Sequence, residues 1–384
     1  MSGSARTRAP HAAFIGTGFM AAVHSRAVRA VGGTPYSCVG ATADRARHGA
    51  ARLGVIRSHD CLDDALNDPL VDVVHVCTPN TTHARIARAA LAAGKHVICE
   101  KPLATSVEDA EGLRAHADRA RGGHAMPFIY RFHPLVREAR ARVRRGELGR
   151  VLSVQGSYLQ DWLLDQGDRD WRVDPALGGP SRAFADVGSH LCDLIEFVSG
   201  SYIVRVQALV RTVFATRGDI APVQTEDIAA VLFELSDGGV GTLLVSQVAP
   251  GRKNALAIEL AGERASVRFE QENPEQLWIG RRHGSQLLLR DPANLSEDAA
   301  RLSIVPAGHP MGYQDAFNAF TADAYARFAG GDPEGLPTFD DGLRSARIVS
   351  AVLTSSRSGQ WTEVSPNDHV VSGERAAGAE RMDA

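Results

Sequence analysis

The chain has little of what marks several large classes of protein. Its five cysteines, Cys38, Cys61, Cys77, Cys99 and Cys192, are odd in number and form no CxxC pair, which argues against a disulfide framework or a zinc site. Lys and Arg total 42 against 45 Asp and Glu, so the net charge of −3 gives no general attraction to nucleic acid or anionic membrane. No apolar run is long enough to span a bilayer, and none follows the polar N-terminus as in a signal peptide. We therefore expect a cytoplasmic protein that binds neither nucleic acid nor membrane and holds no metal.

The length and apolar content are sufficient for two domains. The 384 residues are 44% apolar and 23% charged, which is typical of a globular protein with a large core. Short apolar and longer amphipathic stretches alternate from residue 11 to about 130, and the pattern changes after residue 150. We therefore predict one domain over residues 11–130 and a second over 131–367. Residues 1–10 and 368–384 are polar or small-residue tails that we expect to be disordered.

The first domain alternates short apolar runs with longer amphipathic stretches. The apolar runs lack strict alternation, as buried parallel strands do, and span residues 11–16, 36–41, 71–79, 96–102 and 125–130. The helical stretches are 19–32, 44–54, 60–67, 82–94 and 106–121. This alternation predicts an α/β domain with a parallel sheet and right-handed crossovers.

The second domain has longer runs with partial alternation and hairpin turns such as SDGG and AGER. The runs span residues 151–160, 203–215, 228–249, 254–273 and 275–282. They predict an α+β domain with an open, mostly antiparallel sheet. We expect helices at 134–145, 187–198, 312–330 and 340–358 to cover one face of that sheet.

A glycine-rich loop follows the first predicted strand. The residues GTGFMA at 16–21 close that strand and open a helix, with Gly16, Gly18 and Ala21 at the dinucleotide-binding spacing. Glycine suits the tight turn and the close approach of a pyrophosphate, and a small third residue allows the helix to pack on the strand. The helix N-terminus then offers free N–H groups to the phosphates. The residues predicted to bind the cofactor here are Gly16, Thr17, Gly18, Phe19 and Met20.

The end of the second predicted strand should distinguish NAD from NADP. An acid about 20 residues beyond the glycines binds the ribose 2′-OH, whereas a neutral residue beside an arginine admits a 2′-phosphate. The sequence here is VGATADRAR, with no acid at 40–42 but with Asp44, Arg45 and Arg47 close by. Thr42, Asp44 and Arg45 are therefore the candidates. The pattern leans slightly to NAD and leaves NADP open.

A polar motif interrupts an apolar run at FADVGSHLCDL, residues 184–194. On a helix, Asp186, His190 and Asp193 fall within roughly 60° of one another. The apolar residues on another side of that helix are Leu191, Leu194, Ile195 and Val198. One interpretation is a helix start with Asp186 as its N-cap and a half-buried histidine. The other is an ionisable stripe that faces a cleft.

Four segments together resemble one protein family. They are GTGFMA (16–21), TPNTTHA (78–84), EKPL (100–103) and DVGSHLCD (186–193), and their order and spacing are similar to those of the glucose–fructose oxidoreductase/inositol dehydrogenase/MocA family. The resemblance implies a doubly wound N-terminal Rossmann domain and a C-terminal domain whose open sheet forms homodimer or homotetramer contacts. It also implies an NAD(P)-dependent oxidoreductase that acts on a ring carbinol or ketone of a sugar, amino sugar, glycoside or cyclitol.

The resemblance also implies roles for individual residues. Lys101, Asp186 and His190 match the family's catalytic set, and the Lys101–Pro102 bond is expected to be cis. The cofactor residues that it adds are Thr78, Pro79, Asn80, His83, Glu100 and Lys101. The chain departs from the family pattern at Ala21, which replaces the third glycine, and at the missing acid after the second strand.

The substrate end is less distinctive. Residues 158–172 carry two tryptophans, several acids and an arginine, a composition that fits a polyol, although the tryptophans could equally anchor a loop to the core. Tyr130 and Arg131 resemble a family position near the nicotinamide or the substrate. The substrate candidates are Lys101, Tyr130, Arg131, Gln160, Asp161, Trp171, Arg172, Asp186 and His190.

Oxidation of an alcohol leaves one proton for the protein to manage, since hydride transfer is the cofactor's own chemistry. Our hypothesis is that His190 takes the hydroxyl proton, with Asp186 or Asp193 orienting its ring. Lys101 would hydrogen-bond the same oxygen and stabilise its developing negative charge. A desolvated lysine can also act as a base, so the residues leave open which of the two accepts the proton.

Two other functions remain compatible with the sequence. One is a non-catalytic NAD(P)-binding sensor of the same fold, against which the joint presence of Lys101, Asp186 and His190 argues, because a sensor needs no proton acceptor. The other is a keto-sugar reductase of antibiotic biosynthesis, which would run the same chemistry in reverse.

Overall fold

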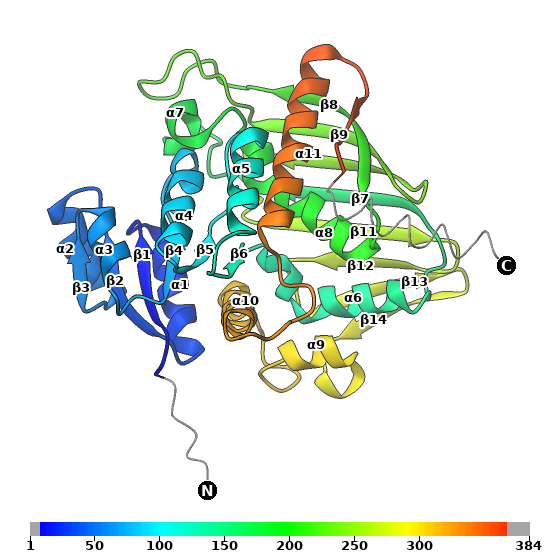
Figure 1. The fold of residues 1–384 in the computed structure, drawn as a ribbon. Helices are drawn as coiled ribbons and strands as arrows, with labels where there is room; N and C mark the ends of the chain where they lie inside the picture. The colour runs from blue at the N-terminus through cyan, green and yellow to red at the C-terminus, as the bar shows by residue number, and fades with distance from the viewer. Residues whose placement is uncertain (1–7, 367–384) are drawn as a thin grey trace, which may run out of the picture. The chain divides into compact units, whose positions relative to one another are not determined.

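The structure, a computed structural model, describes residues 8–366. These residues form two compact units, one of residues 8–133 with 311–339 and one of residues 134–310 with 340–366 (Figure 1). The chain passes from the first unit to the second after His133. Residues 311–339 differ from the expectation, because they join the first unit.

The helix α10 (Tyr313–Phe328) explains this difference. It packs on α1 (Phe19–Ala30), where Arg26 Nε donates to Gln314 Oε1 at 2.8 Å and Gln314 Nε2 donates to the Val23 carbonyl at 3.2 Å. It therefore belongs to the first unit and does not cover the second sheet as we predicted. An amphipathic pattern identifies a helix, but it does not identify the sheet on which that helix packs.

The first unit contains a six-stranded parallel sheet with the order β3-β2-β1-β4-β5-β6. Its strands are β1 (His11–Ile15), β2 (Thr34–Val39), β3 (Arg57–His59), β4 (Val73–Val76), β5 (His96–Cys99) and β6 (His124–Ala125). The connecting helices are α1, α2 (Ala43–Leu53), α3 (Leu62–Asn67), α4 (His83–Ala92) and α5 (Val107–Ala117). The central strand β4 is buried along its whole length, and its sequence VVHV is apolar except for His75. The doubly wound fold is confirmed.

Two details of the first unit correct the sequence prediction. The predicted strand at 125–130 is wrong, because β6 ends at Ala125 and Ile129–Phe132 form a 3₁₀ helix. Pro127 lacks the N–H that a sheet needs, and the Met126 N–H bonds to the Pro337 carbonyl instead. Residues 8–10, predicted as part of a disordered tail, are fixed by Arg8, whose guanidinium donates to Asp72 at 2.7 and 2.9 Å. The remaining predicted tail, 1–7 and 368–384, lies outside the described residues.

The second unit contains a nine-stranded sheet with the order β14-β13-β12-β11-β7-β10-β9-β8-β15. Its strands are β7 (Val151–Leu159), β8 (Ile203–Arg211), β9 (Ile228–Leu235), β10 (Val240–Ser246), β11 (Ala255–Gly262), β12 (Ser266–Glu270), β13 (Gln276–Arg281), β14 (Gly284–Leu289) and β15 (Thr362–Glu363). Only β7 and β10 pair in parallel, so the mostly antiparallel prediction is confirmed. Strands β14 and β15, which lie at the two edges of the sheet, were not predicted.

Helices cover one face of this sheet. They include α6 (Pro134–Arg144), which packs on β12 and β13, and α8 (Ser189–Ser199), which packs on β7 and β11. Leu191 and Ile195 of α8 come so close to Gly156 of β7 that an added Cβ there would lie 3.5 Å from each. The predicted apolar side of this helix is therefore its contact with the sheet. The remaining helices of this unit are α7 (Pro175–Gly178), α9 (Glu297–Leu302) and α11 (Phe339–Ser358), whose first residue belongs to the first unit.

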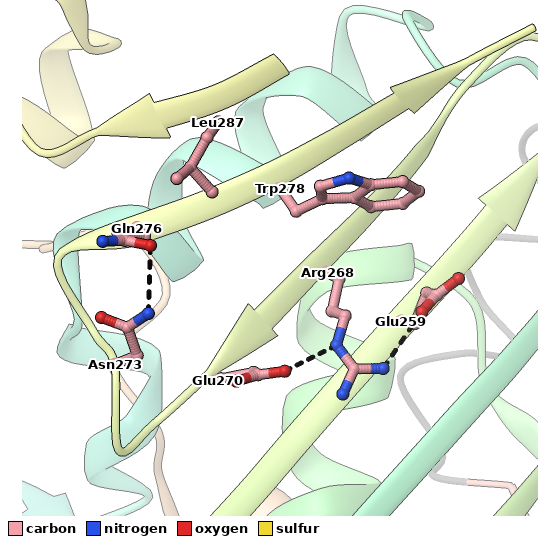
Figure 2. Close-up of a pocket in the computed structure, with 7 residues that line it drawn as sticks. All are labelled: Glu259, Arg268, Glu270, Asn273, Gln276, Trp278 and Leu287. Carbon is pink, nitrogen blue, oxygen red and sulfur yellow. Dashed lines mark hydrogen bonds and ion pairs between the residues drawn. The ribbon is translucent and has the colours of Figure 1, made fainter. Parts of the chain in front are cut away.

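The other face of the second sheet carries exposed apolar side chains. Leu209 and Leu244 flank Ala230 across three neighbouring strands, and they are 50% and 45% exposed. Farther along the sheet, a shallow depression is lined by residues of β11 to β14 and the β12–β13 turn (Figure 2). Trp278 of β13 lies between Leu287 of β14 and Arg268 of β12, and Arg268 bridges Glu259 and Glu270. Within residues 8–366, no helix combines the length and apolar character needed to cross a bilayer.

Candidate active site

The candidate residues of the first unit gather at one edge of its sheet. Strands β1, β4 and β5 run in parallel, so their carboxyl ends meet at the same edge. The glycine loop follows β1, the TPN segment at 78–80 follows β4, and Glu100 with Lys101 follows β5. The Lys101–Pro102 peptide bond is cis, as the resemblance implied.

The glycine loop has the geometry that a dinucleotide requires. Gly16 has φ of +97°, and an added Cβ would lie 2.5 Å from the Cys77 carbonyl oxygen, so this position excludes any side chain. Gly18 is the N-cap of α1, and within the described chain no side chain caps this helix and no atom lies within 4 Å of an added Cβ. The uncapped N–H groups and the open space fit a pyrophosphate.

Of the other residues in the glycine loop, Thr17 and Met20 contact neighbouring elements and Phe19 is exposed. Thr17 packs on α2, where a Cβ added at Gly49 would lie 2.6 Å from the Thr17 Cβ. Phe19 is 66% exposed, whereas the Met20 sulfur lies 3.8 Å from the Tyr313 hydroxyl. Thr17 therefore joins the loop to the second helix through its side chain, which leaves its backbone as the part that a cofactor could use.

The structure explains why no acid stands at position 40. A Cβ added at Gly40 would lie 2.7 Å from the Ala46 Cα, because α2 begins so close to the end of β2. Thr42 caps that helix by accepting a hydrogen bond from the Arg45 N–H at 3.2 Å. The exposed carboxylate of Asp44 pairs with Arg47. An acidic side chain is therefore excluded at position 40, and the exposed charged side chains at this end of the strand come after it.

His83 connects two of the candidate loops. It is 1% exposed, with Nδ1 2.7 Å from the Pro102 carbonyl oxygen and Nε2 2.8 Å from the Thr78 carbonyl oxygen. Burial lowers the pKa of the imidazole, while the two carbonyl oxygens act in the opposite direction. Both ring nitrogens are thus used to hold the loops after β4 and β5, so any effect of His83 on a cofactor passes through those loops. The neighbouring Asn80 is 8% exposed.

Sequence reasoning missed a group of buried polar side chains behind Glu100. They are His24 of α1, His75 of β4 and Tyr325 of α10, which connect to the Glu100 carboxylate. The available signal was a lone histidine inside the apolar strand VVHV. Tyr130 and Arg131 lie in the 3₁₀ helix at Ile129–Phe132 and are 3% and 8% exposed. The Tyr130 ring stacks on His133 at 5.9 Å and 14°.

In the second unit, Asp186 and His190 lie on consecutive helical segments. Asp186 is in a π-helical turn at Phe184–Gly188, and His190 is in the first turn of α8. Asp186 is not an N-cap, because the residue before the π turn is Ala183 and the one before α8 is Gly188. The N-cap interpretation is therefore wrong, and the wider π turn alters the register that an ideal helix predicts. Such turns occur frequently at functional sites.

Two side chains hold the carboxylate of Asp186. Gln247, fully buried at the end of β10, donates its Nε2 to Asp186 Oδ2 at 3.0 Å. Arg172 Nε lies 3.5 Å from the other oxygen, and its guanidinium also stacks on Trp171 and bonds to Asp170. His190 is 8% exposed. The predicted residues Trp171, Arg172 and Asp186 therefore form one cluster, to which the structure adds Gln247.

Gln160 belongs to a neighbouring hydrogen-bonded group. Its Nε2 and the Tyr158 hydroxyl both donate to Asn254 Oδ1, at 2.9 and 2.6 Å, and Trp162 Nε1 donates to Gln160 Oε1 at 2.7 Å. The Tyr158 ring lies 6.5 Å from the His190 ring. Asp161 instead accepts from Lys253 Nζ at 2.7 Å, a hydrogen bond that lowers the pKa of its carboxyl group. Sequence reasoning missed Tyr158 and Asn254.

Known proteins match both units. Residues 11–123 match the model of the oxidoreductase family with an NAD-binding Rossmann fold, and residues 136–268 match that of the GFO/IDH/MocA C-terminal domain. Levoglucosan dehydrogenase of Pseudarthrobacter phenanthrenivorans is 30% identical over 383 residues, which cover 91% of this chain and 97% of that protein.

Solved structures extend the match. An oxidoreductase domain protein from Kribbella flavida is 33% identical with a TM-score of 0.87, covering 94% of this chain and 100% of its own. Levoglucosan dehydrogenase in complex with NADH and L-sorbose is 29% identical with a TM-score of 0.87 and the same coverage. The chain therefore belongs to the glucose–fructose oxidoreductase/inositol dehydrogenase/MocA family of oxidoreductases, and its first unit is an NAD-binding Rossmann domain.

Proposed function

We propose that the protein is a dehydrogenase that transfers a hydride between NAD(P) and a ring carbinol or ketone of a sugar, amino sugar, glycoside or cyclitol. Membership of the family supports the reaction class. The observation that carries the proposal is Asp186, held by Gln247 and Arg172 four residues before the buried imidazole of His190. A binding protein without catalysis has no need of a buried histidine four residues after a carboxylate that is held in place.

The protein's part in this reaction is to position the alcohol and to move one proton. When bound, the nicotinamide accepts or delivers the hydride. His190 takes the hydroxyl proton during oxidation and returns it during reduction, while Asp186 fixes the orientation of the imidazole. Lys101 stabilises the negative charge that develops on the substrate oxygen. Gln160, Trp171 and Arg172 bind the rest of the polyol, since aromatic rings and polar side chains suit its C–H faces and hydroxyls.

The cofactor is held by backbone at one end and by side chains at the other. The pyrophosphate is assigned to the loop Gly16–Met20, and the nicotinamide ribose to Thr78, Asn80 and Glu100. The slight lean to NAD rests on Asp44, whereas Arg45 would favour NADP. Calorimetry with each cofactor separately measures this preference. Binding of NADP tighter than that of NAD would contradict the lean.

A homo-oligomer formed through the second sheet accounts for its exposed apolar face. Leucines exposed by about half on neighbouring strands make a patch that a soluble monomer rarely leaves uncovered. A second copy would cover it with the same residues, as two-fold symmetric interfaces do. Leu244→Glu should convert the oligomer to the 41.0 kDa monomer in light scattering. A monomeric wild type would contradict this assignment.

The function is tested by the absorbance of reduced nicotinamide with a panel of aldoses, anhydrosugars, amino sugars and inositols. We expect turnover with at least one ring polyol and none with open-chain alcohols. Tight cofactor binding without turnover on any member would contradict the proposal and favour a sensor.

A further inference from the structure

Four polar side chains form a continuous buried chain in the first unit. His24 Nε2 lies 2.8 Å from Glu100 Oε1, the Nδ1 atoms of His24 and His75 lie 2.8 Å apart, and His75 Nε2 lies 3.1 Å from the Tyr325 hydroxyl. Both histidines are 0% exposed and Glu100 is 6% exposed. The four residues come from α1, β4, the end of β5 and α10, so only the fold brings them together.

The apolar surroundings require each ring nitrogen to form its hydrogen bond within this series of four side chains. The His24 and His75 rings meet edge to face at 5.1 Å. Phe14 lies 5.2 Å from the His75 ring and Phe317 lies 5.1 Å from the His24 ring. In such an apolar environment an unpaired nitrogen or hydroxyl is costly, which restricts where the protons can be.

The donor and the acceptor of each hydrogen bond between these four side chains can be assigned. Burial raises the pKa of the Tyr325 phenol, which keeps its proton and can donate it to His75 Nε2. Burial holds the pKa of His75 well below its usual value, so this neutral ring then carries its proton on Nδ1 and donates it to His24 Nδ1. His24 Nε2–H finally donates to Glu100. Every hydrogen bond in the chain therefore points toward the carboxylate.

The carboxylate at the end of this chain adjoins the site lysine. Its second oxygen, Oε2, accepts from the Lys101 backbone N–H at 3.2 Å. We propose that His24, His75 and Tyr325 are positioning residues that hold the Glu100 side chain in a fixed orientation against the Lys101 backbone. The proposal rests on the proposed function for the role of Lys101 in turnover, whereas the proton arrangement and the hold on the Lys101 backbone are independent of it.

Nitrogen NMR of ¹⁵N-histidine-labelled wild type tests the proton arrangement without substrate. We expect His75 as the less common Nδ1–H tautomer and His24 as the Nε2–H tautomer. Observation of His75 as the Nε2–H tautomer, or of His24 with both nitrogens protonated, would reverse the direction and overturn the proposal.

Two substitutions of His24 test the positioning role. In His24→Gln the amide nitrogen takes the place of Nε2, so the hydrogen-bond donor to Glu100 is kept. In His24→Asn the amide nitrogen takes the place of Nδ1 only, so the donor to Glu100 is lost. We expect His24→Asn to lower kcat and to speed amide exchange at Lys101, each by about tenfold or more, as for a lost hydrogen bond to a charged group. His24→Gln should retain most of both properties, with KM little changed in either variant.

Controls separate this role from stability and from the proposed function. His96→Asn, on the same sheet but outside the chain, should leave kcat and Lys101 exchange unchanged, and thermal unfolding should show both His24 variants folded. Equal kcat and equal Lys101 exchange in the two His24 variants overturn the proposal. If His24→Asn does not fold, Tyr325→Phe replaces it, with faster Lys101 exchange expected. Absence of turnover in the wild type would contradict only the proposed function. The histidine tautomers and the Lys101 amide exchange are measured without substrate and test the positioning role independently.

Discussion

In the first unit several histidine side chains are almost fully buried, whereas in the second unit the almost fully buried side chains include arginines that pair with carboxylates. In the first, burial lowers the pKa of His75, His83 and His133, to about 4 for the last of these. In the second, Arg182 and Arg217 are both almost fully buried and both donate to Asp227. A buried neutral imidazole destabilises the folded state when the pH falls low enough to protonate the ring. A buried ion pair destabilises the folded state when one partner is removed, because the other charge is left without its counter-charge. We therefore expect the first unit to be destabilised by acid and the second by substitution of a charged partner.

The largest effect is expected in the second unit. Asp227→Asn leaves two guanidinium groups buried without their counter-charge, and should lower the free energy of unfolding by about 3–5 kcal/mol. Urea denaturation measures this change. Glu263→Gln, which removes an exposed pair with Arg150, is the control and should cost about 1 kcal/mol or less. If both variants lost a similar free energy of unfolding, the effect of removing an ion pair would not depend on its burial.

A smaller, pH-dependent effect is expected in the first unit. His133 has a folded-state pKa of about 4, below the usual 6.5, so the unfolded chain binds the extra proton and stability falls as pH drops from about 6.5 to 4. The full loss from this group is about 3 kcal/mol. His133→Phe keeps a ring against Tyr130 and should flatten the dependence of Tm on pH in this window.

The exposed His283 of the second unit provides the control for that experiment. His283→Asn should leave the pH dependence of Tm unchanged. An unchanged slope in His133→Phe would mean that this histidine is not the source of the acid sensitivity.

The smallest effect concerns the two carboxylates that the sequence left as alternatives beside His190. Because Gln247 and Arg172 hold Asp186, we expect Asp186→Asn to lower kcat by roughly 10–100-fold, part of what positioned proton transfer contributes. Asp193→Asn should change kcat by less than about threefold. Steady-state kinetics of the two variants decides between them, and the reverse order would assign the orienting role to Asp193.

The sequence predicted the parts of the site that depend on local backbone. Gly16 has a positive φ and a crowded position that few other residues could fill, and the short glycine motif around it can be recognised without a structure. Gln247, Tyr158 and Asn254 could not be found in this way, because their partners lie 61, 32 and 94 residues away or more. The π turn at Asp186 was hidden for the same reason, since Glu226, some 40 residues later, accepts from the Phe184 N–H at its start.

The proton-transfer role of His190 is measured by the turnover of His190→Ala with the best polyol found. We expect a kcat lower by roughly 10²–10⁴-fold, with the dissociation constant of the reduced cofactor within about twofold of the wild type. Turnover at the wild-type rate in this variant would contradict it.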